Sequence, residues 1–184
     1  MTKRVLVPVS RGFEEIEAIT IIDILRRAGS EVVVAGVDGN RVTGRSAITV
    51  VPDTSLNDAL EKGPYDMMVL PGGLPNAHTL RDDPRIIGAL QKTLAEGGKV
   101  GAICAAPVAL ERAGLLDARP ATSAPSAEKE LMSAVYSTDR VVVSGPVATS
   151  RSAGTAMEFA FALVRELFGD DKVDEVNKGV LARL

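Results

Sequence analysis

The sequence predicts an α/β protein in which a mostly parallel sheet is covered by helices on both faces. Predicted strands and helices alternate along the chain, and this order requires right-handed crossovers between parallel strands. The predicted strands are short, continuously apolar runs, as in strands that are buried on both faces. Hydrophobic residues make up 46% of the chain but aromatic residues only 3%, so the core must consist mainly of Val, Ile, Leu and Ala.

The N-terminal part of the chain is predicted to form a strand, a helix and a second strand. Residues 4–9 (RVLVPV) form the first buried strand, and the helix that follows covers residues 13–28. Two arginines in its last turn and Gly29 directly after it are typical of a helix end. Residues 31–35 (EVVVA) form the second strand, which completes a β–α–β unit.

The middle of the chain is predicted to leave the sheet and return to it. The Asp38-Gly39 pair indicates a turn that leads into a hairpin-like excursion over residues 47–51. Residues 67–70 (MMVL) form the third buried strand. Asp83 followed by Pro84 is a typical helix start, and this helix is expected to reach about Ala95.

The C-terminal part repeats the alternation. Residues 99–103 (KVGAI) form a strand, and residues 105–113 a helix. A further strand is expected over residues 141–144. The last long helix is expected over residues 155–167, and a short tail helix over residues 171–178.

Length and composition exclude several classes of function. The 184 residues fit a single domain over residues 1–184. With 21 basic and 24 acidic residues, charge gives no argument for nucleic acid or an anionic membrane as a partner, and no stretch is apolar enough to span a bilayer. One cysteine and one histidine cannot form an internal disulfide or a four-ligand zinc site, and no metal is expected. We therefore expect a cytoplasmic protein.

Two turns are expected to meet at one edge of the sheet. Gly72 and Gly73 follow the third strand, and Cys104 directly follows the strand over residues 99–103. In parallel sheets, ligands bind beyond the carboxyl ends of the strands. Backbone N–H groups of Gly72, Gly73 and Ala105 could there stabilise an oxyanion, although a pair of glycines is also common in plain turns.

Cys104 is the candidate nucleophile. Between a strand and a helix, its sulfur would face free backbone N–H groups and the positive end of the helix dipole, which favour the thiolate and lower the pKa. Small neighbours, among them Ala105 and Ala106, leave room for a substrate. The alternative is that this cysteine is only a small buried apolar residue.

Glu17 is the candidate proton carrier. At helical spacing its neighbours include Phe13, Thr20, Ile21 and Ile24, so it lies beside an apolar stripe. A carboxyl group there should be partly desolvated, with a raised pKa. The alternative is an ordinary acidic residue in the first turn of a helix.

Two further polar features are expected near this edge. Ser150 and Arg151 belong to a segment that leads into the last long helix and could line a substrate pocket. The alternative role of this segment is helix capping by Ser152 or Thr155. His78, the only histidine, is expected in a solvated polar loop.

With these residues in view, the chain resembles the ThiJ/PfpI superfamily, in the DJ-one-like branch of the parkinsonism-associated deglycase. The similarity covers nearly the whole chain. It is carried by residues 12–17 (GFEEIE), 26–29 (RRAG), 63–66 (GPYD), 70–73 (LPGG), 102–107 (AICAAP) and 149–151 (TSR).

The resemblance implies a flavodoxin-like three-layer sandwich and a homodimer. It also implies an easily oxidised, nucleophilic Cys104 on a strained turn, with Glu17 in hydrogen-bond contact with its sulfur. Gly73 and Ala105 would be the oxyanion donors. Many members carry a histidine where this chain has Ala124, and protease-like members often have one where it has Ala105, so no Cys–His pair and no peptide hydrolysis are expected.

Two functions of different classes follow. The first is a glyoxalase or deglycase acting on methylglyoxal-like dicarbonyls or their adducts, without glutathione, metal or other cofactor, through Cys104 and Glu17. The second is a redox-responsive stress protein or chaperone that uses oxidation of Cys104. A glutaminase-like activity would need a histidine late in the chain, and none follows His78. Dinucleotide and nucleotide-phosphate motifs are absent from the sequence.

Overall fold

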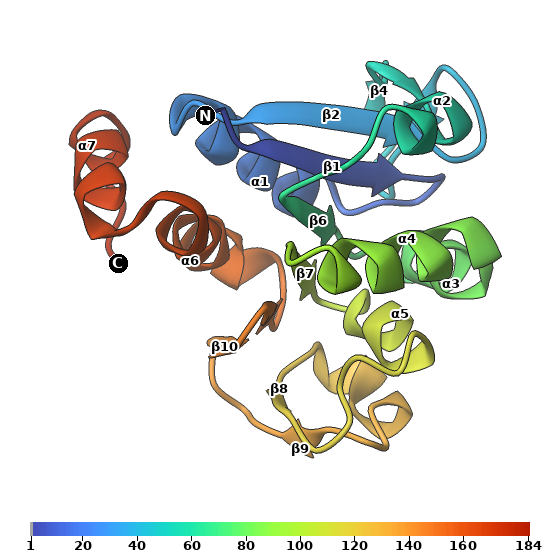
Figure 1. Cartoon of the computed structure of the whole chain (residues 1–184). Helices are drawn as coiled ribbons and strands as arrows, with labels where there is room; N and C mark the ends of the chain where they lie inside the picture. The colour runs from blue at the N-terminus through green and yellow to red at the C-terminus, as the bar shows by residue number, and fades with distance from the viewer. Residues whose placement is uncertain (1) are drawn as a thin grey trace.

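The computed structural model describes residues 2–184 and is built around one seven-stranded sheet (Figure 1). Its strands run in the order β10-β11-β7-β6-β1-β2-β5, and all neighbours are parallel except β10 and β11. This confirms the predicted α/β class. The strands are β1 (Arg4–Val9), β2 (Glu31–Gly36), β5 (Thr54–Ser55), β6 (Met67–Leu70), β7 (Lys99–Ile103), β10 (Val141–Ser144) and β11 (Val147–Ser150).

Helices cover both faces of this sheet, and two small strand pairs lie outside it (Figure 1). The helices are α1 (Glu15–Arg27), α2 (Leu56–Glu61), α3 (Leu74–Asp82), α4 (Pro84–Ala95), α5 (Pro107–Arg112), α6 (Ala156–Phe168) and α7 (Asp170–Val180), with 3₁₀ turns η1 (Pro125–Glu130) and η2 (Ala153–Thr155). The small pairs are β3 (Val42–Thr43) with β4 (Thr49–Val50), and β8 (Pro120–Ala121) with β9 (Val135–Tyr136).

The strands feed two separate cores because successive side chains point to opposite faces. In β6, Met67 and Val69 join the core with α1 and α6, whereas Met68 and Leu70 join the core with α3, α4 and α5. All four side chains are buried. Burial on both faces explains why these strands read as continuous apolar runs.

Several predicted elements are confirmed residue by residue. Strands β1, β6, β7 and β10 and helix α4 have the predicted bounds. Helix α1 begins at Glu15, two residues later than predicted, after Gly12 at a φ of +79° and an extended Glu14. Helix α5 is shorter than predicted because it begins only at Pro107, after the turn that contains Cys104.

Several elements were not predicted or were assigned wrongly. Strand β11 was not predicted; it pairs antiparallel with β10 through a turn at Gly145 and lies parallel to β7 on its other side. Helix α3 was read as a polar loop, because Pro75 and Asn76 stand near its start. Helix α2 is a short helix capped by Ser55.

Candidate active site at the Cys104 turn

The carboxyl ends of β1, β6 and β7 lie next to one another in the sheet, and each is followed by a turn. The turn after β6 contains Gly72 and Gly73, and Cys104 directly follows β7. Because α1 starts a few residues after β1, its first turn reaches the same place, and the amide N–H of Gly72 donates to the Glu17 carboxyl. The predicted meeting of these residues at one edge is therefore found.

Cys104 occupies a strained backbone conformation. Its φ of +64° lies in the left-handed region, which residues other than glycine rarely adopt. Two hydrogen bonds hold it there: its N–H donates to the carbonyl of Ser150 at 2.9 Å, and its carbonyl accepts from the N–H of Ala124 at 2.8 Å. The side chain is half-buried. A small reagent can therefore reach the sulfur while the backbone beneath it stays fixed.

Gly72 and Gly73 bring the backbone close to the sulfur. A Cβ on Gly72 would lie 2.6 Å from the Cβ of Cys104 and 2.6 Å from Oε2 of Glu17. Gly73 has a φ of +87°, and a Cβ there would collide with the carbonyl oxygen of Gly12. The N–H groups of Gly73 and Ala105 both hydrogen-bond the Cys104 sulfur. Only glycines allow this approach from the β6 side.

Glu17 is fully buried and contacts the cysteine. Its Oε2 accepts from the N–H of Gly72 at 2.8 Å, and its Oε1 is buried without a hydrogen-bond partner among the described residues. The carboxyl group lies close enough to the Cys104 side chain for the thiol to lower its pKa. Burial raises the pKa of Glu17 from its ordinary value of 4.5 to about 7, against the opposing effects of the Gly72 and Cys104 hydrogen bonds. The raised pKa agrees with the sequence prediction.

The pKa of Cys104 departs from the sequence expectation. Burial, with the negative charge of Glu17, raises the pKa of this thiol from 9.0 to about 11. The N–H groups of Gly73 and Ala105 lower it, as expected of a turn before a helix, but they are outweighed. Because burial disfavours the charged form of both groups, the pair carries at most one negative charge at neutral pH.

Asn76 organises the site and was missed in the sequence. It is fully buried on α3; its Nδ2 donates to the carbonyls of Pro71 (2.8 Å) and Gly72 (3.1 Å), and its Oδ1 accepts from the N–H and hydroxyl of Ser10. It thus ties the end of β1 to the turn after β6. A buried amide in a predicted loop gave no signal, because that segment was not recognised as a helix.

A charged hairpin lies near Cys104 and Glu17. The β3–β4 hairpin carries Arg45, whose Nη1 lies 3.1 Å from the Glu14 carboxylate and whose positive charge lowers the pKa of Glu17 slightly. Glu15 fixes this loop by accepting from the N–H groups of Ser46 and Ile48. The hairpin therefore packs against the start of α1, the helix that carries Glu17.

The remaining candidates lie in different settings. Ser150 is fully buried. Its hydroxyl donates to the carbonyl of Arg140, and its own carbonyl accepts from the N–H of Cys104. Arg151 is half-buried, with its Nη1 buried and unpartnered. His78 lies on α3 rather than in a loop, and its side chain is 41% exposed.

The segment before α6 makes the capping interactions that the sequence offered as its alternative role. Ser152 and Thr155 form a reciprocal capping box around η2. Among residues 2–184, no cluster of three or more His, Cys, Asp or Glu side chains could hold a metal ion, and no helix has the length and hydropathy to cross a membrane.

Fold and site together define a class of protein: an α/β sandwich whose cysteine lies on a strained strand-to-helix turn, in contact with a buried carboxyl group and two backbone N–H groups. The sequence model of the DJ-1/PfpI family matches residues 3–166, and the chain belongs to this family.

Two relatives and one crystal structure show the extent of the similarity. The chain is 40% identical over 184 residues to protein dj-1beta of Drosophila melanogaster, covering 98% of both proteins. It is 37% identical over 167 residues to the glutathione-independent glyoxalase DJR-1.2 of Caenorhabditis elegans, covering 90% of this chain and 88% of that protein. The crystal structure of Drosophila melanogaster DJ-1beta matches over the full length of both chains with a TM-score of 0.95 and 39% identity. This match confirms the flavodoxin-like arrangement.

Proposed function

We propose that this protein is a glutathione-independent glyoxalase, with deglycase-type activity on dicarbonyl adducts, in which Cys104 is the nucleophile and Glu17 the proton carrier. The observation that carries the proposal is the contact between the half-buried thiol and a fully buried carboxyl group whose pKa is about 7. A general acid–base works best when its pKa lies near the working pH. The similarity to a glyoxalase of Caenorhabditis elegans supports this substrate class.

The proposed reaction begins with proton transfer rather than with a preformed thiolate. Glu17 accepts the thiol proton as the sulfur of Cys104 bonds to the aldehyde carbon of methylglyoxal. It then passes this proton to the aldehyde oxygen, which gives a hemithioacetal and leaves Glu17 ionised. Glu17 then removes the proton from that carbon and returns it to the neighbouring ketone carbon, while the hydroxyl proton moves to the ketone oxygen, which yields a thioester of lactate. Water hydrolyses the thioester, so that methylglyoxal and one water give one lactate and the free thiol.

The backbone supports the charged intermediates. The N–H groups of Gly73 and Ala105 point at the sulfur and stand where an oxyanion next to it would form. A dicarbonyl adduct of an amine would pass through the same thioester after the amine has left. We place Arg151, with its unpartnered Nη1, at the side of the site where a substrate oxygen would be held, and Ser150 as support through its carbonyl.

The test is lactate formation from methylglyoxal by the purified protein in the absence of glutathione. Cys104→Ala and Glu17→Gln should each reduce the rate to that of a free thiol in solution, because each removes one of the two reacting groups. His78→Ala should keep the wild-type rate, since this histidine is exposed and lies outside the Cys104–Glu17 pair. Wild-type protein that makes no lactate above a free-thiol control would contradict the proposal.

A second candidate function is redox sensing, and the unpartnered Oε1 of Glu17 favours it. If peroxide oxidises Cys104 to a sulfinate, a protonated Glu17 can donate a hydrogen bond from this atom to the new oxygen. Mild peroxide should then add two oxygen atoms to Cys104 in the wild type, and this product should be lost in Glu17→Ala. Equal oxidation of both proteins would rule out this role for Glu17.

We also propose a homodimer in a reducing cytoplasm. Ile16 and Ile19 are exposed by 58% and 47% on one face of α1, and Ile48 of the adjoining hairpin is exposed by 57%. Contiguous apolar residues of this kind mark interaction surfaces. A cytoplasmic location suits a protein whose only cysteine must stay a thiol between turnovers.

A further inference from the structure

We propose that Arg140 is a positioning residue for Cys104: it clamps the segment between β11 and α6 and thereby holds the Ser150 carbonyl that fixes the strained cysteine. Arg140 stands just before β10 and makes no contact with the sulfur. The inference rests on the proposed function only in that Cys104 is the reacting group, and the test below reads the thiol directly.

The strained turn depends on restraints from other segments. A non-glycine residue at a φ of +64° stays there only when its surroundings hold it. On one side the restraint is the N–H of Ala124, which donates to the carbonyl of Cys104. On the other side it is the carbonyl of Ser150, which accepts from the Cys104 N–H at 2.9 Å. If Ser150 moves, the sulfur moves relative to the N–H groups of Gly73 and Ala105.

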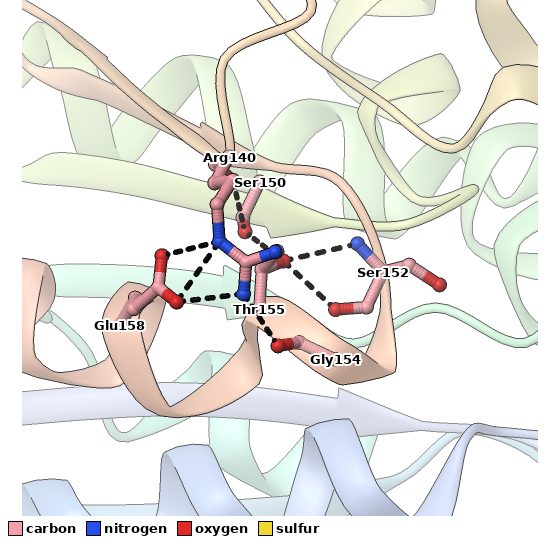
Figure 2. A network of polar contacts seen from close by, with 6 residues as sticks. All are labelled: Arg140, Ser150, Ser152, Gly154, Thr155 and Glu158. Carbon is pink, nitrogen blue, oxygen red and sulfur yellow. Dashed lines mark hydrogen bonds and ion pairs between the residues drawn. The ribbon is translucent and has the colours of Figure 1, made fainter. Parts of the chain in front are cut away.

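Ser150 is itself held by hydroxyl contacts (Figure 2). Its Oγ lies 2.8 Å from the carbonyl oxygen of Arg140 and 2.6 Å from the Oγ1 of Thr155. Thr155 in turn contacts the backbone N–H and carbonyl of Ser152, which closes the turn η2. The end of β11 is thus tied both to the start of β10 and to the turn before α6.

The guanidinium of Arg140 braces this turn from outside (Figure 2). Its Nε and Nη2 form a forked contact with the carboxylate of Glu158, at distances of 2.6 to 2.9 Å, and Nη2 also donates to the carbonyl of Gly154 at 2.8 Å. Glu158 lies in the first turn of α6. One side chain therefore joins β10, η2 and α6 around Ser150, a geometry that a lysine could not reproduce.

Because the Arg140–Glu158 pair is partly exposed, its effect on the position of Cys104 can be measured apart from its effect on global stability. The side chains of Arg140 and Glu158 are 59% and 34% exposed, and an ion pair in such a setting contributes little to global stability. Loss of the Arg140 side chain should therefore leave the fold intact. Its effect should appear in the geometry of the Cys104 turn, two hydrogen bonds away.

The experiment measures the rate of Cys104 alkylation by iodoacetamide from pH 6 to 11, with the thermal midpoint of each variant. In Arg140→Met we expect the pH profile to shift upward, because the sulfur loses part of its contact with the N–H groups that favour the thiolate. About a threefold lower rate at pH 8 corresponds to half a pH unit. Arg165→Met is the matched control, since it breaks a similar exposed ion pair, with Asp170, at the other end of α6.

Glu158→Gln provides a second route to the same result. It should shift the profile in the same direction, and the double variant should shift no further than Arg140→Met, because Glu158 acts through its contact with Arg140. An unchanged profile in Arg140→Met and Glu158→Gln, or an equal shift in Arg165→Met, would overturn the proposal. Because alkylation requires no turnover, a protein that alkylates normally but makes no lactate would contradict the proposed function and leave this inference standing.

Discussion

Glu17 is fully buried beside the half-buried Cys104, and at the scale of single residues their contact governs how easily either group is ionised. Burial disfavours the charged form of both groups, so the pKa of the carboxyl rises to about 7 and that of the thiol to about 11. In the proposed reaction, the sulfur becomes nucleophilic as it passes its proton to Glu17, so the carboxyl group takes part in the first step.

The raised pKa of Glu17 makes the fold less stable at higher pH. Between pH 4.5 and about 7 the native protein keeps on Glu17 a proton that the unfolded chain has released, so the free energy of unfolding falls as pH rises through this range. The contribution is present below pH 4.5 and lost above 7. Glu17→Gln should thus unfold with a free energy about 2 to 3 kcal/mol higher than the wild type at pH 8.

Urea unfolding of both proteins at pH 4.5 and pH 8 checks this prediction. The two proteins should differ at pH 8 and be alike at pH 4.5, because a protonated Glu17 and a glutamine make similar contacts. A difference that is independent of pH would show that the carboxyl group does not titrate near 7.

Sequence reasoning placed Cys104 and Glu17 at one site but did not predict the pKa of the thiol. Glu17 was found because helical spacing places it beside Phe13, Ile21 and Ile24, all of which are buried. The direction of the Cys104 pKa was wrong, because the turn and helix dipole could be read locally whereas burial and the charge of Glu17 come from the tertiary structure. Asn76 was missed for the same reason, since its partners lie in two other segments.

At the scale of elements, the turns after the strands set how closely the backbone approaches the sulfur. Gly73 and Gly97 both have a positive φ, of +87° and +82°, but differ in their surroundings. A Cβ on Gly73 would collide with Gly12, whereas one on Gly97 would meet nothing within 4 Å. The two positions therefore separate the cost of the backbone conformation from the cost of crowding.

We expect Gly97→Ala to lower the free energy of unfolding by about 1 kcal/mol, the usual cost of a left-handed residue. Gly73→Ala should lower it by roughly 3 kcal/mol or more, since the backbone of two turns must move apart as well. It should also slow Cys104 alkylation, whereas Gly97→Ala should not. Equal losses of stability in the two variants would mean that the turn after β6 accommodates the added methyl group without strain.

Elements with strong local signals were predicted well, and those defined by pairing were not. Strand β6 is a buried apolar run, and α4 has Asp83 as its N-cap and Pro84 in its first turn, so both had the predicted bounds. Strand β11 is a short segment (VATS) that ends in polar residues, and it becomes a strand only because β7 and β10 lie on either side of it. Its place beside β7 is nevertheless what gives Cys104 the Ser150 carbonyl.

At the scale of the whole molecule, apolar side chains of α1 and of the adjoining hairpin remain exposed. These are Ile16, Ile19 and Ile48, which the second copy of the chain in the proposed dimer would bury. Ile16→Lys should convert the proposed dimer to a monomer in sedimentation velocity, because burying an unpaired charge there is costly. Met132→Lys is the control, as Met132 is 87% exposed near η1 and lies outside this surface. A wild-type chain that sediments as a monomer would contradict the dimer.

The side-chain amide of Asn76 should govern how this edge of the sheet opens locally. It holds the end of β1 and the turn after β6 through four hydrogen bonds, and the Gly72 N–H between them is bonded to Glu17. These contacts can open only together. The amide protons of Ser10 and Gly72 should therefore exchange with solvent deuterium at one common, slow rate, in a single cooperative fluctuation of this edge rather than by fraying of separate loops.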